Sequence, residues 1–268
     1  MRFYDSFKKE HLIAGHRGWR TIRPENTLSA FEAAVGHFDF IELDLRLSRD
    51  GHYVVMHDAT LERTTDAAEV FPQKASPRYV ADYTLSQLRQ LDAGRWFLQR
   101  DPFSTLANGK VAVCDIERLL PQKIPTIEEV LTFGRTSGMP LNLEIKDMPH
   151  RDEHEVVDLF LRSLGPISEA PTLIVSSFNR RYLQILKKKA PAVPTALLVA
   201  KSLPDPLMPL LERLGVEACH ADRRLADRVP VRSLSRNKIA SALYTVNDAA
   251  QRKAYFKQGF RALFSDIP

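Results

Sequence analysis

Cysteine is scarce in this sequence. The 268 residues include only Cys114 and Cys219, which lie far apart and have no CxxC spacing. This argues against a disulfide framework and against a metal site built from thiolates. We expect both thiols to be buried or inert.

Long hydrophobic runs are also absent. No stretch approaches the roughly 18 apolar residues that would span a bilayer, which excludes an integral membrane protein. Residues 1–18 carry charges on both sides of a very short apolar patch, and they lack the long apolar region of a secretory signal. We therefore expect a cytoplasmic protein.

Basic residues exceed acidic ones, giving a net charge of +5, but the excess has no aromatic residues interleaved for base stacking. It gathers within residues 180–189 and 223–238, and such charge runs are usually solvated helix faces. We do not expect a nucleic-acid partner. The sequence leaves open whether the chain forms a homodimer.

The stretch that the sequence is best analysed from is residues 40–58, FIELDLRLSRDGHYVVMHD. Glu42 and Asp44 alternate with apolar residues at the period of a strand, so both carboxylates lie on one face. Such a pair suits a hard cation such as Mg²⁺ or Ca²⁺, although a solvated face of a half-buried strand has the same pattern. Asp50-Gly51 indicates a hairpin turn that leads to His57.

Polar groups also follow other short apolar runs. Residues 12–14 lead into Gly15-His16-Arg17-Gly18, and Asn26 or Thr27 can cap the helix that follows. Thr126 and Glu129 have the spacing of a capping box. In residues 141–146, Asn142, Glu144 and Lys146 share one face of a strand.

Strands alternate with helices along most of the chain. Leaving out the hairpin arm at residues 53–57, eight strands begin near residues 12, 41, 141, 172, 195, 216, 241 and 262. This pattern predicts an α/β fold, namely a parallel (β/α)8 barrel, and we expect residues 1–268 to form one domain. Residues 60–123 form an irregular insertion after the second strand, with one clear helical piece at residues 85–91.

In such a barrel the polar strand ends converge on one mouth. Each residue alone has an ordinary structural explanation, such as a buried histidine with its hydrogen bonds made within the core or an ion pair at the end of a strand. Together they offer three carboxylates for a metal, two imidazoles for proton transfer and two cations for an anion, which is what phosphate chemistry needs. The residues are His16, Arg17, Glu42, Asp44, His57, Glu144 and Lys146.

The sequence resembles the glycerophosphodiester phosphodiesterase family from residue 12 to its end. The motifs that carry the resemblance are Gly15-His16-Arg17-Gly18, Pro24-Glu25-Asn26-Thr27, Ile41-Glu42-Leu43-Asp44, Asp50-Gly51, His57-Asp58 with Leu61, Arg63, Thr64 and Thr65, Ile124-Pro125-Thr126, Leu143-Glu144-Ile145-Lys146, Ser176-Ser177-Phe178, Thr245-Val246-Asn247 and Ser265-Asp266-Ile267-Pro268.

The resemblance implies a role for each matching residue. Glu42, Asp44 and Glu144 would bind one divalent cation, Mg²⁺ or Ca²⁺, and His16 and His57 would be the acid/base pair. The phosphate would contact Arg17 and Lys146. The family also implies the barrel and its insertion.

The expected reaction is metal-dependent hydrolysis of a glycerophosphodiester to glycerol 3-phosphate and an alcohol such as choline or ethanolamine. Two alternatives are a phospholipase D-like activity on lysophospholipids and a barrel that binds phosphodiesters without turnover. The first needs an acyl groove, which insertion aromatics would line: Phe71, Trp96, Phe97 and Phe103. Tyr244 in place of the usual Trp, and an unusual segment at residues 107–120, depart from the family pattern at the pocket wall and its lid.

Overall fold

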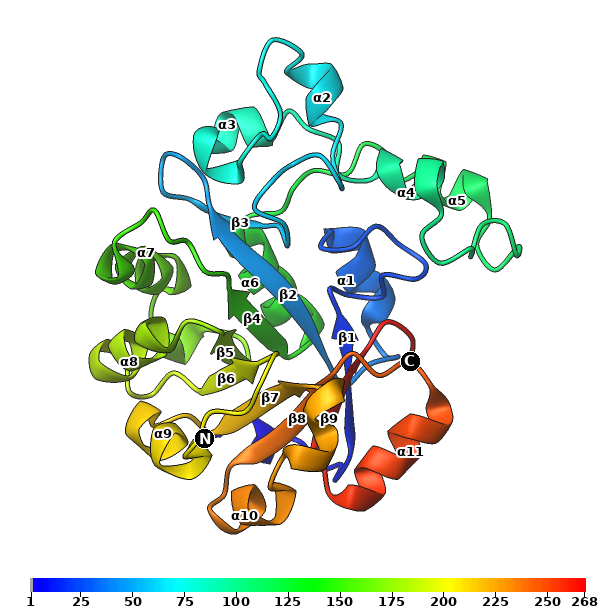
Figure 1. The fold of residues 1–268 in the computed structure, drawn as a ribbon. Helices are drawn as coiled ribbons and strands as arrows, with labels where there is room; N and C mark the ends of the chain where they lie inside the picture. Colours follow the sequence, from blue (N-terminus) through cyan, green and yellow to red (C-terminus); the bar gives the residue numbers. More distant parts are fainter. Residues whose placement is uncertain (1) are drawn as a thin grey trace.

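A closed parallel barrel forms the centre of the computed structural model, which describes residues 2–268 (Figure 1). Neighbouring strands follow the order β1-β9-β8-β7-β6-β5-β4-β2, and pairing of β1 with β2 closes the ring. All these pairs are parallel. The strands are β1 Leu12–His16, β2 Phe40–Leu47, β4 Leu141–Ile145, β5 Leu173–Ser177, β6 Thr195–Val199, β7 Ala218–Asp222, β8 Ala240–Tyr244 and β9 Ala262–Ser265.

Helices surround the barrel, so the predicted (β/α)8 architecture is confirmed (Figure 1). They are α1 Leu28–Ala34, α6 Ile127–Ser137, α7 Glu153–Leu164, α8 Arg180–Lys189, α9 Leu207–Leu214, α10 Val231–Arg236 and α11 Ala249–Gln258. Helix α7 has no counterpart among the predicted elements. Its buried residues Val156, Val157, Phe160 and Leu164 have the helical spacing that would have indicated it.

The capping hydrogen bonds predicted at the starts of two helices are confirmed. Thr27 caps α1 by accepting a hydrogen bond from the Ala30 amide, and Asn26 is free for another contact. Thr126 and Glu129 form the predicted capping box of α6 in both directions. These caps fix where the two helices begin.

Aromatic side chains fill one end of the barrel. Its strands contribute several alanines to the interior, Ala14, Ala196, Ala218, Ala242 and Ala262. Phe3 and Tyr4, from the segment around η1 (Tyr4–Ser6), pack there against Phe40, which in turn packs against Phe264. Small strand residues leave room that these rings occupy, so this end is a packed core and the polar groups lie at the other end.

The hairpin and insertion follow β2. Strand β3 (Tyr53–Val55) pairs antiparallel with β2, which confirms the hairpin. The expectation of one helical piece in the insertion was wrong, because it also contains α2 Ala67–Val70, η2 Val80–Asp82, α4 Arg95–Arg100 and α5 Val113–Glu117 beside α3 Leu85–Leu88. Each spans only one or two turns, too few residues for a helical period to emerge in the sequence.

Three of the four insertion aromatics are buried, and the fourth, Phe103, is partly buried against the core that contains Trp96 and Phe97. Phe71 lies in one small core with Leu61 and Leu88, while Trp96 and Phe97 lie in a second with Ile116. Phe97 has no exposed surface. These side chains hold the insertion together as two satellite cores.

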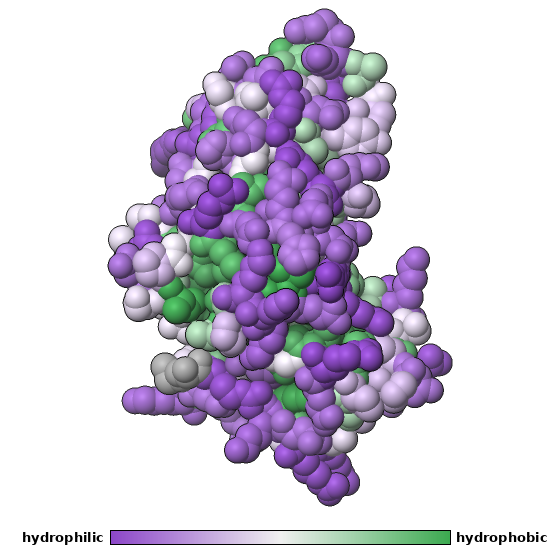
Figure 2. Space-filling model, turned by 90° about the vertical axis from the view of Figure 1, so that its left-hand side faces the viewer, coloured by the Kyte–Doolittle hydropathy of each residue, from purple (hydrophilic) through white to green (hydrophobic). Residues whose placement is uncertain are grey.

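The surface is mostly hydrophilic in the view of Figure 2, and the larger hydrophobic areas lie in recesses near the middle of this face. Among residues 2–268, no helix is both long and apolar enough to cross a membrane. Cys219 is buried as expected, but Cys114 is exposed on α5. Cys114 is not buried because α5 turns Ile116 rather than Cys114 into the core, and an inert thiol stays a prediction for this residue.

Candidate active site

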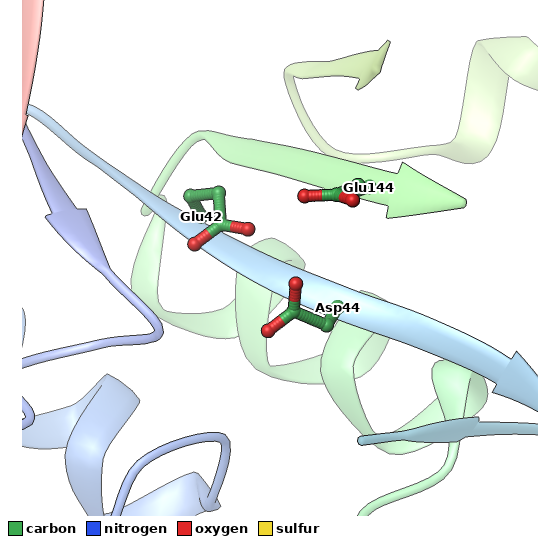
Figure 3. Close-up of side chains that lie close together, drawn as sticks. All are labelled: Glu42, Asp44 and Glu144. Atoms are coloured by element: carbon green, nitrogen blue, oxygen red, sulfur yellow. The ribbon is translucent and has the colours of Figure 1, made fainter. Parts of the chain in front are cut away.

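Three carboxylates meet at the barrel mouth. Glu42 and Asp44 project from β2 and Glu144 from the adjacent β4, and their side chains point toward one another (Figure 3). Asp44 and Glu144 are paired residues in the strand register. One oxygen from each of the three carboxylates lies within 4.8 Å of the others, and all three residues are buried. Strand period and parallel register together produce this cluster.

Two cations contact the carboxylates. The Lys146 ammonium lies 2.9 Å from an oxygen of Asp44 and 2.7 Å from one of Glu144. Arg17 forms an ion pair with Asp44 at 3.2 Å, and its backbone amide donates to Glu42 at 3.0 Å. The predicted phosphate contacts therefore lie beside the predicted metal ligands.

The electrostatics show that the cluster has excess negative charge. Burial raises the pKa of Glu42 well above its usual value, and the charges of Asp44 and Glu144 raise it further. Burial also raises the pKa of Glu144. For Asp44 burial acts in the same direction, but Lys146 and Arg17 outweigh it and hold the pKa well below its usual value. Three acids against two cations leave one carboxylate without a positive partner.

This donor set fits a hard divalent cation. Carboxylate oxygens are the ligands that Mg²⁺ and Ca²⁺ prefer, and an added cation would balance the third acid. A further oxygen is close by, because Oδ1 of Asn142 is buried without a hydrogen-bond partner and Asn142 lines the same cavity. Asn142 shares the strand face predicted for Glu144 and Lys146.

Both histidines face this cavity, and each is held by a carboxylate. Nδ1 of His16 lies 2.7 Å from Asp266, and Nδ1 of His57 lies 2.6 Å from Asp58. Burial lowers the pKa of His16, and the hydrogen bond to Asp266 opposes the shift. A carboxylate at Nδ1 fixes the ring so that Nε2 is left for proton transfer.

All seven residues singled out in the sequence line one cavity of about 130 Å³. Tyr244 lines it too, as expected for a wall residue, and its hydroxyl donates to the carbonyl of Val199 at 2.7 Å. Phe178, Leu198 and Phe264 supply apolar walls. The structure therefore brings the predicted residues together without exception.

Several supporting residues were not among the predicted site residues. Asn26 donates to Asp44 at 2.8 Å from a backbone with φ of 57°, a conformation that asparagine tolerates better than most residues. Asp58 and Asp266 orient the histidines, and Glu25 binds arginines behind them. Asp58 could have been found by its position next to His57. Asp266 lies 250 positions from His16, so only the closed barrel brings them together.

Comparison with known proteins agrees with this geometry. A profile of the Glycerophosphoryl diester phosphodiesterase family matches residues 16–268. The chain belongs to this family. It is therefore an enzyme with glycerophosphodiester phosphodiesterase activity, and the motifs that suggested the resemblance are family motifs.

Relatives and solved structures cover almost the whole chain. A glycerophosphodiester phosphodiesterase of Bacillus subtilis is 31% identical over 96% of this chain and 84% of its own length. One from Caldanaerobacter subterraneus is 28% identical over 96% of this chain and 94% of its own length. An Oleispira antarctica phosphodiesterase, solved with the product sn-glycerol-3-phosphate, has a TM-score of 0.80 at 27% identity and covers 100% of this chain and 96% of its own.

Proposed function

We propose that the chain hydrolyses glycerophosphodiesters such as glycerophosphocholine or glycerophosphoethanolamine to sn-glycerol 3-phosphate and the free alcohol. The observation that carries this proposal is the cavity in which three buried carboxylates, two cations and two carboxylate-held histidines meet. The product found in the structure of the Oleispira antarctica relative supports the choice of product.

In this proposal Glu42, Asp44 and Glu144 hold one divalent cation, Mg²⁺ or Ca²⁺. When bound, the ion would polarise a phosphoryl oxygen and lower the pKa of a hydroxyl group. The binding set requires all three carboxylates in their ionised form, and Arg17 and Lys146 support that form of Asp44.

The remaining work falls to side chains of the protein. Arg17 and Lys146 lie at fixed positions where they can balance charge that develops on the phosphoryl oxygens. One histidine accepts the proton of the attacking hydroxyl, and the other donates a proton to the leaving alkoxide. The same arrangement serves water or the substrate's own glycerol 2-hydroxyl as the attacking group.

Phosphorus NMR of the reaction products tests the proposal. Glycerophosphocholine, incubated with the protein and a divalent cation, should yield sn-glycerol 3-phosphate and choline. Formation of phosphocholine instead would contradict the assigned bond cleavage.

Lysophosphatidylcholine is the matched comparison substrate, because it carries the same headgroup plus an acyl chain. We expect it to react much more slowly, since Phe71, Trp96 and Phe97 are buried in satellite cores and Phe103 packs against one of them. Faster hydrolysis of lysophosphatidylcholine than of glycerophosphocholine would show that the phospholipase D-like alternative is correct.

A further inference from the structure

A chain of ion pairs runs behind the two histidines. On one side, Arg63 holds Asp58, with Nε 2.5 Å from Oδ2 and Nη2 3.2 Å from Oδ1, and Asp58 in turn binds His57. On the other side, Nη1 of Arg20 lies 3.6 Å from the Asp266 oxygen that binds His16 and 3.4 Å from Nδ1 of His16 itself. Each histidine therefore has a carboxylate at Nδ1 and an arginine beside that carboxylate, and on the His16 side the arginine also reaches the ring.

Glu25 joins the two sides. Its Oε1 accepts from Arg63 at 2.6 Å, and its Oε2 accepts from Arg20 at 2.5 Å. Arg17, the candidate phosphate contact, donates to Oε1 as well, at 2.8 Å. The Glu25 side chain is only 2% exposed, so three guanidinium groups surround one buried carboxylate.

Opposite charges alternate in this network. The positive groups are Arg17, Arg20 and Arg63, the negative groups are Glu25, Asp58 and Asp266, and Arg17 is shared with Asp44 of the carboxylate cluster. Burial opposes ionisation of Glu25, but the arginines outweigh it and lower its pKa to about 2. Without that charge the three guanidinium groups would repel one another in a site with little water to screen them.

The network also spans separate parts of the fold. Glu25 lies in the loop between β1 and α1, Arg63 comes from the start of the insertion, and Asp266 follows β9. One buried carboxylate thus fixes three loops relative to one another at the barrel mouth.

We propose that Glu25 is a positioning residue that sets the orientation of both histidines at once, through Arg63 and Asp58 on one side and through Arg20 and Asp266 on the other. The inference rests on the proposed roles of His16 and His57 in proton transfer. It assigns Glu25 no contact with the substrate.

The first test is the near-isosteric substitution Glu25→Gln, which removes the charge. Loss of the hydrogen-bond partners that orient metal ligands typically costs about 10- to 100-fold in activity. We expect a loss of that size when the partners that orient the two histidines are disturbed. The loss should fall mainly on kcat, because Arg17 keeps its second contact with Asp44. Displacement of both rings lowers the rate of chemistry more than it weakens binding.

A double-mutant cycle shows whether Glu25 acts through the histidine partners. In the Asp58→Asn background, and separately in the Asp266→Asn background, Glu25→Gln should lower kcat by a smaller factor than in the wild type, because one of the two branches is already disrupted. Glu129→Gln is the matched control, because Glu129 also binds an arginine, Arg89, through two contacts of 2.8 and 2.9 Å far from the cavity. Glu25→Gln should retain its full effect in that background.

Nitrogen-15 NMR of the histidine rings gives a readout that does not depend on turnover. Signals of His16 and His57, assigned from the spectra of His16→Gln and His57→Gln, should both shift in Glu25→Gln and stay in place in Glu129→Gln. Unchanged signals for both rings, or equal kcat losses in all backgrounds, would overturn the proposal. Near-wild-type turnover of His16→Ala or His57→Ala would instead overturn the proposed function.

If Glu25→Gln does not fold, Arg63→Lys replaces it. Arg63 is one-third exposed, and lysine keeps the charge but cannot hold Glu25 and Asp58 together as the guanidinium does. The His57 signal should then shift and the His16 signal should not. A shift of neither signal would contradict the proposal.

Discussion

At the scale of the residue, each histidine in the cavity has a carboxylate at Nδ1 and an Nε2 free for the substrate. The two carboxylates come from different places: Asp58 is the next residue in the chain, while Asp266 lies beyond the last strand. Two rings held by separate carboxylates can stand on different sides of a bound phosphorus atom, as in-line displacement requires.

Alanine substitutions test these two rings. His16→Ala and His57→Ala should each lower kcat for glycerophosphocholine by about 10²- to 10⁴-fold, the usual range for loss of a general acid or base. His154→Ala, on the exposed surface of α7, is the matched control and should retain full turnover. Steady-state kinetics of the three variants provide the comparison, and near-wild-type turnover of either cavity variant would show that its assignment is wrong.

The seven predicted residues of the cavity could be identified because each lies in a short stretch of sequence at or just after a strand. Strand period places Glu42 with Asp44, and Glu144 with Lys146, on common faces, and a parallel barrel brings strand ends together. Glu25 could not be assigned in this way. Its partners Arg20 and Arg63 are set by the path of two irregular loops, which no period in the sequence encodes.

At the scale of the element, the loop from β1 to α1 depends on close backbone packing. Gly18 has φ of 80°, and a Cβ at this position would lie 2.7 Å from the backbone of Ala30 in α1. The Trp19 amide donates to the Ala30 carbonyl at 2.9 Å, so loop and helix cannot move apart freely. Only glycine fits between them.

Gly18→Ala and Gly36→Ala separate this contact from backbone strain. Gly36 has φ of 79° and no atom within 4 Å of an added Cβ, so its substitution should cost about 1 kcal/mol from strain alone. Gly18→Ala adds a collision with backbone and should cost about 3 kcal/mol. Urea unfolding measures both, and equal losses would contradict the packing account.

Activity should distinguish the same two variants. Gly18 follows Arg17 directly, so its substitution should lower kcat/KM in the folded fraction, whereas Gly36→Ala should not.

Elements of regular length and period, such as α6 and α8, could be predicted from the sequence. Of the helices of the insertion only α3 could be predicted, and α2, α4 and α5 could not, because four to six residues make too few turns for a pattern.

At the scale of the whole molecule, the packed end of the barrel carries a buried histidine. His220 on β7 has no exposed surface, and its Nε2 lies 2.8 Å from the hydroxyl of Tyr4. Nδ1 has no partner. Burial lowers the pKa of His220 to about 3, so the ring is neutral in the folded protein over the physiological range.

This histidine predicts a pH dependence of stability. In the unfolded chain it titrates near its ordinary value of 6.5, so between pH 6.5 and 3 the unfolded state binds one more proton. The free energy of unfolding should therefore fall by about 1.4 kcal/mol per pH unit below 6.5 from this residue alone. Above 6.5 the residue contributes no slope.

His220→Gln tests this, because glutamine does not titrate but can still pair with Tyr4. In the variant the slope of the unfolding free energy against pH should be smaller by the contribution of one proton, and urea titration from pH 7 to 4 measures this slope. An unchanged slope would show that His220 is not the group responsible.

The central claim is that the three-carboxylate cluster at the barrel mouth makes diester hydrolysis dependent on a divalent cation. The most direct measurement is release of sn-glycerol 3-phosphate from glycerophosphocholine by chelator-stripped protein, before and after addition of Mg²⁺ or Ca²⁺. Glu144→Gln is assayed alongside, because the substitution removes one charge from the cluster. We predict that stripped wild-type protein is inactive and recovers with one of the ions, and that Glu144→Gln needs far more of it. Full turnover without any divalent ion, in wild type and variant alike, would contradict the account.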